Sequence, residues 1–162
     1  MNYTQEISEV YGKHLEDSRQ PKPTAKDTLL RISSVGSCLR QRAFEALKYQ
    51  ETNPIDKSTL IAFEIGNAIH EGIQEACQKA YSGQYELALD LTPLTNVSLS
   101  GSCDGLVWVD DETQRLLELK TVSSFGFKLA RDGLPKMAHV AQAALYAMAC
   151  EVDELWIVYV AK

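Results

Sequence analysis

The feature that most constrains the fold is a short run that turns back on itself, with acidic residues on both sides of the turn. Leu106 to Val109 reads as one strand, Asp110 to Gln114 as a polar turn, and Arg115 to Thr121 as the returning strand. A turn at the middle of this run places Asp104 directly across from Glu118. The sequence therefore predicts an antiparallel hairpin that brings two carboxylates together.

Two carboxylates on facing strand positions need a physical reason to be there. Facing residues on antiparallel strands have Cβ atoms roughly 4.5–5.5 Å apart, so like charges at such positions repel. A divalent cation between Asp104 and Glu118 would offset the repulsion, since Mg²⁺ and Mn²⁺ prefer carboxylate oxygens. Lys120 follows on the same strand face. The alternative is that Asp104 lies in a loop, while Glu118 and Lys120 are ordinary solvent-facing strand residues.

Length and composition limit the classes of protein that the chain can form. With 162 residues, of which 45% are hydrophobic, it has enough material for one domain with a real core. The first thirty residues are polar, and no apolar run approaches membrane-spanning length, so we expect a cytoplasmic protein without a membrane partner. Four scattered cysteines favour free thiols over a zinc site or a disulfide framework. They are Cys38, Cys77, Cys103 and Cys150.

Charge is distributed unevenly along the chain. The formal net charge is −6, but the segment from Arg19 to Lys48 holds seven basic residues against two acidic ones. A second basic group follows the Glu-x-Lys strand. Such polarisation predicts a local phosphate-binding surface, although solvated charge is the usual explanation of any one such stretch. The candidate substrate-binding residues are Arg31, Arg40, Arg42, Lys128, Arg131 and Lys136.

The remaining pattern predicts alternating helices and strands. We expect helices over 4–15, from a cap at Ser33 or Ser34 to about 49, and over 57–81, 124–131 and 136–150; strands are expected over 85–91, 97–101 and 155–160. This order implies an α/β fold whose mixed sheet is covered by helices. Residues 1–27 would form an amino-terminal helix and tether, and residues 28–162 the main domain.

Two helices carry further candidate residues. His70 lies one turn after Gly66, at the edge of a second apolar stripe, where a histidine is more often a satisfied core group than a metal ligand; Gly66, which permits a close approach of another backbone, shifts this balance slightly toward the ligand. Gln142 and Tyr146 are four residues apart and therefore share a helix face. The alternative is that both residues lie on an ordinary polar flank of the helix, with the tyrosine hydroxyl reaching water.

Four short motifs in this order resemble those of the PD-(D/E)XK nuclease superfamily. They are Gly-x-x-x-His at Gly66 and His70, Gly-x-x-Asp-Gly ending at Gly105, Glu-x-Lys at Glu118 and Lys120, and Gln-x-x-x-Tyr at Gln142 and Tyr146. The chain looks most like the RecB-like exonuclease branch, which includes CRISPR-associated RecB-like nucleases and phage recombination nucleases. The resemblance covers roughly residues 33–162. It implies a three-layer restriction-endonuclease-like core with a central mixed sheet.

The resemblance also implies a role for each motif residue. The implied ligands of Mg²⁺ or Mn²⁺ are His70, Asp104, Glu118 and the backbone carbonyl of Leu119. Lys120 would orient or activate water and stabilise charge on the phosphate. Gln142 and Tyr146 would position the substrate or the lysine.

The chain departs from the family pattern in two places. Cys103 replaces the proline that names the superfamily. The replacement is tolerated because the side chain at this position performs no chemistry. Iron–sulfur members of the branch pair an early cysteine, in a context like Cys38 and Arg40, with three more after the last core strand. This sequence ends at Lys162 without those three, so we expect no iron–sulfur cluster unless the chain is a fragment.

The expected function is hydrolysis of DNA phosphodiester bonds in recombination or repair, with exonuclease action favoured. A structure-specific endonuclease is the enzymatic alternative, and a noncatalytic nucleic-acid-binding module is the alternative of another class. The expected partners are single- or double-stranded DNA and a recombination or annealing protein.

Overall fold

The computed structural model describes residues 3–18, 30–47, 49, 53 and 55–162. Its helical elements are α1 (Tyr3–Ser18), the short 3₁₀ helix η1 (Ile32–Ser34), α2 (Leu39–Ala46), α3 (Lys57–Ala80), α4 (Thr92–Thr95), α5 (Ser124–Arg131) and α6 (Met137–Ala149). Its strands are β1 (Leu30–Arg31), β2 (Gly83–Asp90), β3 (Leu99–Trp108), β4 (Gln114–Val122) and β5 (Leu155–Ala161). The predicted helices and strands are found in the predicted order, except that two predicted strands form the single strand β3 and that β1, η1 and α4 were not predicted.

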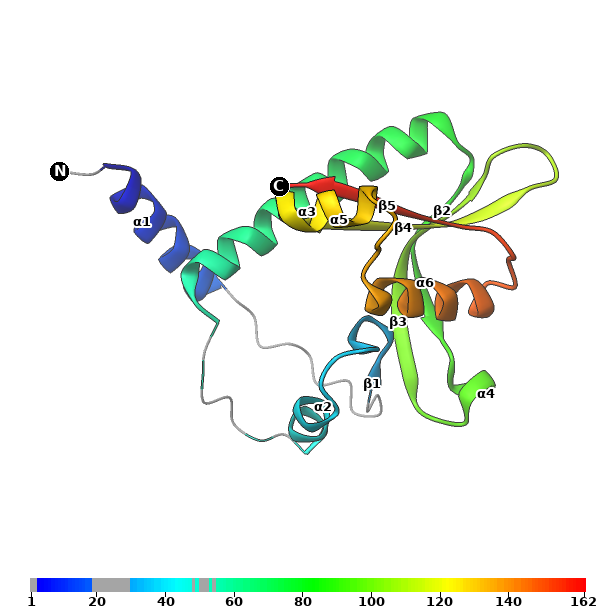
Figure 1. Cartoon of the computed structure of the whole chain (residues 1–162), viewed down its shortest axis with the longest axis horizontal. Coiled ribbons are helices and arrows are strands. Elements are labelled where there is room, and N and C mark those ends of the chain that lie inside the picture. The colour runs from blue at the N-terminus through cyan, green and yellow to red at the C-terminus, as the bar shows by residue number, and fades with distance from the viewer. Residues whose placement is uncertain (1–2, 19–29, 48, 50–52, 54) are drawn as a thin grey trace.

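The strands form one mixed sheet with β3 near its centre. Strand β3 pairs with β1 in parallel and with β2 and β4 in antiparallel orientation, while β4 pairs with β5 in parallel. Helices α3 and α5 lie on one face of the sheet and α6 lies on the other (Figure 1). The expected three-layer α/β fold with a mixed sheet flanked by helices is thus confirmed.

The hairpin has the register that the sequence predicts. Gly105 pairs with Leu117 and Trp108 with Gln114, so continuing the register places Asp104 across from Glu118. One detail differs: 97–101 and 106–109 are not separate strands, because β3 is continuous over ten residues. The Ser-Gly-Ser run within it is tolerated because β2 pairs with all three residues and so holds the backbone extended.

Helix α3 is positioned by its first turn and by one glycine. Asp56 caps it, its side chain accepting a hydrogen bond from the Thr59 N–H at 2.9 Å. At Gly66 the helix approaches β4 so closely that an added Cβ would lie 2.9 Å from Thr121 Oγ1. His70 follows one turn later, so this close approach determines how near the histidine comes to the sheet.

The segment before α3 differs from the sequence prediction. Ser33 and Ser34 do not cap a long helix, because they lie within η1; α2 begins after Cys38 and ends at Ala46. The reason is a turn at Gly36, whose φ of +78° breaks helical geometry. Helix α1 extends to Ser18, three residues into the predicted tether, and the rest of that tether lies outside the described residues.

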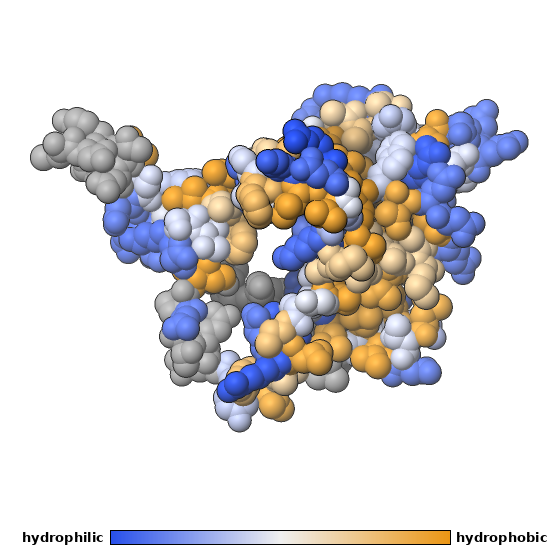
Figure 2. Space-filling model, in the orientation of Figure 1, coloured by the Kyte–Doolittle hydropathy of each residue, from blue (hydrophilic) through white to orange (hydrophobic). Residues whose placement is uncertain are grey.

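The core lies mainly between the sheet and α6. Leu116 and Cys103 are buried there beside Ala143 and Tyr146 of α6. Elsewhere apolar side chains remain on the surface, over α5 and α6, and this face is hollowed between α5 and the α2 segment (Figure 2). Among the described residues, none of the helices has the combined length and apolar character that crossing a bilayer requires.

Candidate functional site

The site forms where the β3–β4 ladder stops. The last paired residues are Gly105 and Leu117. One step further, the carboxylate of Asp104 accepts a hydrogen bond from the Leu119 N–H at 2.6 Å, in place of a main-chain acceptor. Its other oxygen lies 3.3 Å from His70 Nδ1. At the break in the ladder, Asp104 therefore joins the backbone of β4 to a side chain of α3.

Glu118 is buried beside this break. It is 2% exposed, and its Oε1 accepts hydrogen bonds from Lys120 Nζ and, at 2.8 Å, from Gln142 Nε2. Its Oε2 is buried without a hydrogen-bond partner. Burial raises the pKa of Glu118 to about 7, although the neighbouring Lys120 ammonium opposes this shift. Glu118 thus has one oxygen available to a ligand and a pKa close to neutral pH.

Lys120 is held by two acceptors on the α6 side of the sheet. Its ammonium donates to Glu118 and, at 3.1 Å, to Gln142 Oε1. Gln142 in turn lies 3.4 Å from the hydroxyl of Tyr146. The hydroxyl of Tyr146 occupies the space over Gly101, where an added Cβ would meet it at 2.7 Å. Burial raises the pKa of Tyr146 to about 12, so it is a neutral phenol at physiological pH.

The backbone of Leu119 faces the same gap as the acidic side chains. Its N–H points to Asp104, and in a strand the N–H and C=O of one residue point to the same neighbouring strand. The carbonyl that the family resemblance proposes as a ligand therefore lies on the side of Asp104.

Two residues of this neighbourhood were not predicted from the sequence. Gln74, only 8% exposed, donates to Glu86 Oε1 at 2.5 Å and lies 3.4 Å from the Asp104 carbonyl oxygen. Gln74 carried a usable signal, since it lies four residues after His70 and must share its helix face. Glu86 carried none, because it is an exposed residue in an alternating strand.

The candidate phosphate-binding residues lie apart from one another. Arg31 is on β1 and Arg40 on α2, where its guanidinium lies 5.5 Å from the Phe44 ring centroid. Lys128 is on α5 and Lys136 immediately before α6. In Figure 1 the start of α6 lies between α2 and α5. All four of these basic residues are exposed.

Two of the six candidate basic residues are already paired with acidic neighbours. Arg42 contacts Glu45 at 2.6 Å, and Arg131 contacts Asp132 at 3.3 Å. These two are weaker candidates for phosphate contact than the other four residues.

The donor atoms of the site match a divalent cation in their chemistry. Two carboxylates and one imidazole suit Mg²⁺ or Mn²⁺ chemically, and the unpartnered Glu118 Oε2 is an oxygen that a cation would satisfy. Within the described part of the chain, no three such side chains are already gathered around one point. The residues fit a cation in chemistry and neighbourhood, and binding would require side-chain rotation away from the present contacts, such as His70 to Asp104 and Lys120 to Glu118.

Comparison with known proteins adds a likeness of fold. No protein-family model matches the chain, and no curated protein matches it. The crystal structure of SSO0001 is similar in structure, with a TM-score of 0.61 and 14% identity, over 98% of this chain and 72% of that one. At this identity the likeness concerns the fold alone.

Proposed function

We propose that the chain is a divalent-metal-dependent deoxyribonuclease in which exonuclease action is favoured. The observation that carries the proposal is the buried Glu118, with one oxygen free and the other bound by Lys120 and Gln142, next to Asp104. Burying an ionisable group costs free energy unless it is paired or coordinates a metal. A buried carboxylate at the place where two strands separate is better explained by binding of a cation than by packing.

The ligands would be Asp104, Glu118, His70 and the Leu119 carbonyl. When bound, the cation would supply Lewis acidity toward the phosphate and lower the pKa of a water. The residues of the chain have separate tasks. The Leu119 N–H fixes the Asp104 carboxylate, and Gln142 holds both Glu118 and the lysine.

Lys120 is placed to stabilise negative charge that develops on the phosphate. Its ammonium donates to Glu118 and Gln142, and it would be able to donate to a nonbridging phosphate oxygen if Glu118 held a cation. Tyr146, a neutral phenol beneath Gln142, positions that amide. We further propose that the exposed Arg31, Arg40, Lys128 and Lys136 hold DNA, and that the protein acts in cytoplasmic recombination or repair, with an annealing or recombination protein as partner.

The test is cleavage of labelled DNA with Mg²⁺ or Mn²⁺. Linear and circular substrates, single- and double-stranded, are incubated with wild type and with Asp104→Asn, each end being labelled in turn. An exonuclease degrades linear DNA from one end and spares circles, and the variant is inactive. Cleavage of circles would support the structure-specific endonuclease instead.

One observation favours a noncatalytic nucleic-acid-binding module. The candidate ligands are paired with one another and with Lys120 rather than collected around one point, within the part of the chain described. If wild type binds DNA but cleaves neither DNA nor RNA with any divalent cation, this second function replaces the first.

A further inference from the structure

Glu86 has an unusual backbone at a defined place in the sheet. Strands β2 and β3 pair from Gly83 to Asp90 in one unbroken register, except that Glu86 and Asp104, which face each other in that register, are not paired. Glu86 has a φ of +51°, in the left-handed region. For a residue with a Cβ this conformation costs about 1–2 kcal/mol, and glycine would adopt it at no such cost.

The side chain of Glu86 is held rather than free. Gln74 Nε2 donates to its Oε1 at 2.5 Å, and Ser102 Oγ lies 3.4 Å from its Oε2. The same Gln74 nitrogen lies 3.4 Å from the carbonyl oxygen of Asp104, at the register position where β2 gives no partner. Gln74 therefore contacts both the strained residue and the main chain that carries the central carboxylate.

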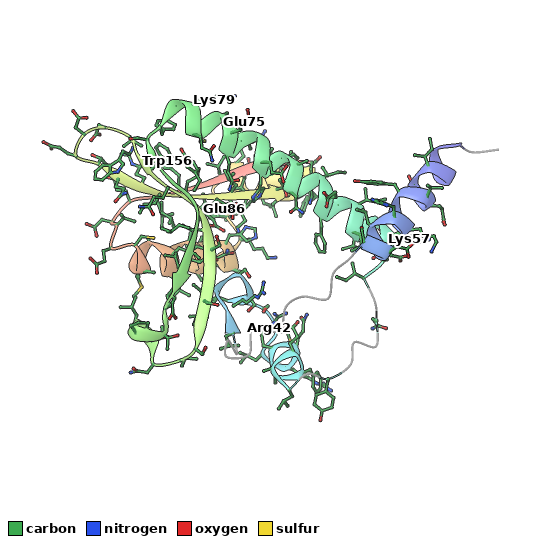
Figure 3. All side chains as sticks on the ribbon, turned by 180° about the vertical axis from the view of Figure 1, so that it is seen from behind. Arg42, Lys57, Glu75, Lys79, Glu86 and Trp156 are labelled. Carbon is green, nitrogen blue, oxygen red and sulfur yellow. The ribbon has the colours of Figure 1, made fainter. Side chains whose placement is uncertain are left out.

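The strand register places three acidic residues in a row on adjacent strands. Glu86 of β2 faces Asp104 of β3, and the β3–β4 register continues to Glu118 of β4. Glu86 and Glu118 are thus on either side of Asp104. Figure 3 labels Glu86 in the middle of the molecule, whereas Glu75 and Lys79 lie along the outside of α3.

A strained glutamate is a poor choice for stability alone. Glu86 is exposed, so it adds little to the core. Its negative charge repels that of Asp104. The electrostatic cost is offset if a cation binds at Asp104, and the backbone strain is then the cost of holding the Glu86 charge at that place. The charge of Glu86 then strengthens cation binding at Asp104, and Gln74 keeps Glu86 and the Asp104 main chain at a fixed separation.

We propose that Gln74 and Glu86 are a pair of positioning residues that raise the affinity of the Asp104 site for a divalent cation. The inference rests on the proposed function in that it takes Asp104 as a cation ligand, but it does not depend on the protein's cutting DNA. Glu86 acts through its charge and Gln74 through its two contacts.

The test is calorimetric titration of Mn²⁺ into the full chain at pH 7.5, without DNA. Glu86→Gln keeps an acceptor for Gln74 and removes the charge; we expect the Kd to rise by about tenfold, the order expected when one nearby unit charge is removed at a partly exposed site. Gln74→Leu removes both contacts at similar volume and should weaken binding several-fold. Because the residues act as a pair, the double variant should be weaker than the worse single variant by less than the product of the two effects.

The matched control is Glu75→Gln, which removes a charge from the adjacent residue on α3, where Glu75 pairs with Lys79. Its Kd should stay within twofold of wild type. A merely structural role predicts a lower melting temperature with unchanged Kd, so thermal unfolding is measured in parallel. If Gln74→Leu fails to fold, Gln74→Asn, which shortens the amide, replaces it.

Three results would overturn the inference. They are a wild type that binds no Mn²⁺, Glu86→Gln affinity equal to that of Glu75→Gln, or fully multiplicative effects in the double variant. Wild type that binds Mn²⁺ with the expected variant effects but cleaves no nucleic acid would instead remove the proposed nuclease activity and leave this pair in place.

Discussion

The Asp104 carboxylate accepts a hydrogen bond from the Leu119 N–H at 2.6 Å, so an acidic side chain provides the acceptor where the pairing of β3 with β4 ends. Asp104 is therefore a structural acceptor as well as a candidate ligand. Asp104→Asn keeps an oxygen for the N–H, whereas Asp104→Ala leaves a buried donor without a partner.

The first prediction separates these two roles. Asp104→Ala should lower the free energy of unfolding by about 1–3 kcal/mol, the cost of one unsatisfied buried donor, and Asp104→Asn should be destabilised much less. Both should lose cation binding and cleavage. Denaturant unfolding of the metal-free proteins measures the difference; equal stability of the two variants would contradict the acceptor role.

A second prediction concerns pH. The pKa of Glu118 is raised from its ordinary 4.5 to about 7 by burial, so the folded state binds the proton more tightly than the unfolded state. This contribution to stability is fully present below about pH 4.5, decreases as pH rises, and is lost above about pH 7, with a total of up to about 3 kcal/mol. Burial raises the pKa of Asp104 as well, and so acts in the same direction.

The measurement is the metal-free melting temperature across this range. Wild type should become less stable from pH 4.5 to 7.5, and Glu118→Gln should flatten the profile. Glu112→Gln, on the exposed hairpin turn, is the control and should follow wild type. A wild-type profile that rises toward neutrality would show that Glu118 is not the dominant group.

The third prediction distinguishes an enzyme from a binding module. Lys120 donates and cannot coordinate a cation, so Lys120→Ala should bind DNA within a few-fold of wild type. Single-turnover cleavage should be at least about a hundredfold slower, the scale for losing one electrostatic stabiliser of the transition state. Unchanged single-turnover cleavage would remove the lysine from the mechanism.

His70 gives the fourth prediction, because its imidazole nitrogen lies 3.3 Å from Asp104 and its side chain is partly exposed. His70→Ala should weaken Mn²⁺ affinity about tenfold or more, with little change in the metal-free melting temperature. His14→Ala, on the exposed surface of α1, is the matched control. A large fall in melting temperature with normal Mn²⁺ affinity would make His70 a packing residue.

The fifth prediction concerns the DNA path. Replacing Arg31 and Arg40 by glutamine should weaken DNA binding, and the salt slope should fall by roughly 0.9 for each duplex phosphate that is no longer neutralised, or 0.7 on a single strand. Arg115→Gln is the control, since Arg115 is already paired with Glu154 and lies over Trp156. If the salt dependence of DNA binding is unaltered, the DNA contacts Lys128 and Lys136 instead.

The hairpin could be predicted because one turn determines its register, and the register alone sets Asp104 opposite Glu118. Helix α5 was predicted with its observed bounds, and in the structure Ser123 caps it. Glu86 could not be found, because an exposed strand glutamate has no sequence signature and its contact with Gln74 of α3 is not local. The two-residue β1 was missed for a similar reason: its pairing with β3 is not local.

The outer position of β5 has a consequence for handling the protein. The strand has the sequence LWIVYVA, pairs with β4 along one side, and among the described residues no other strand pairs with its second side. Segments rich in β-branched and aromatic residues with an open edge are sites where a second chain adds by strand pairing. If preparations self-associate at high concentration, this edge is the expected place of contact, and the extension that a carboxyl-terminal fusion adds would begin beside it.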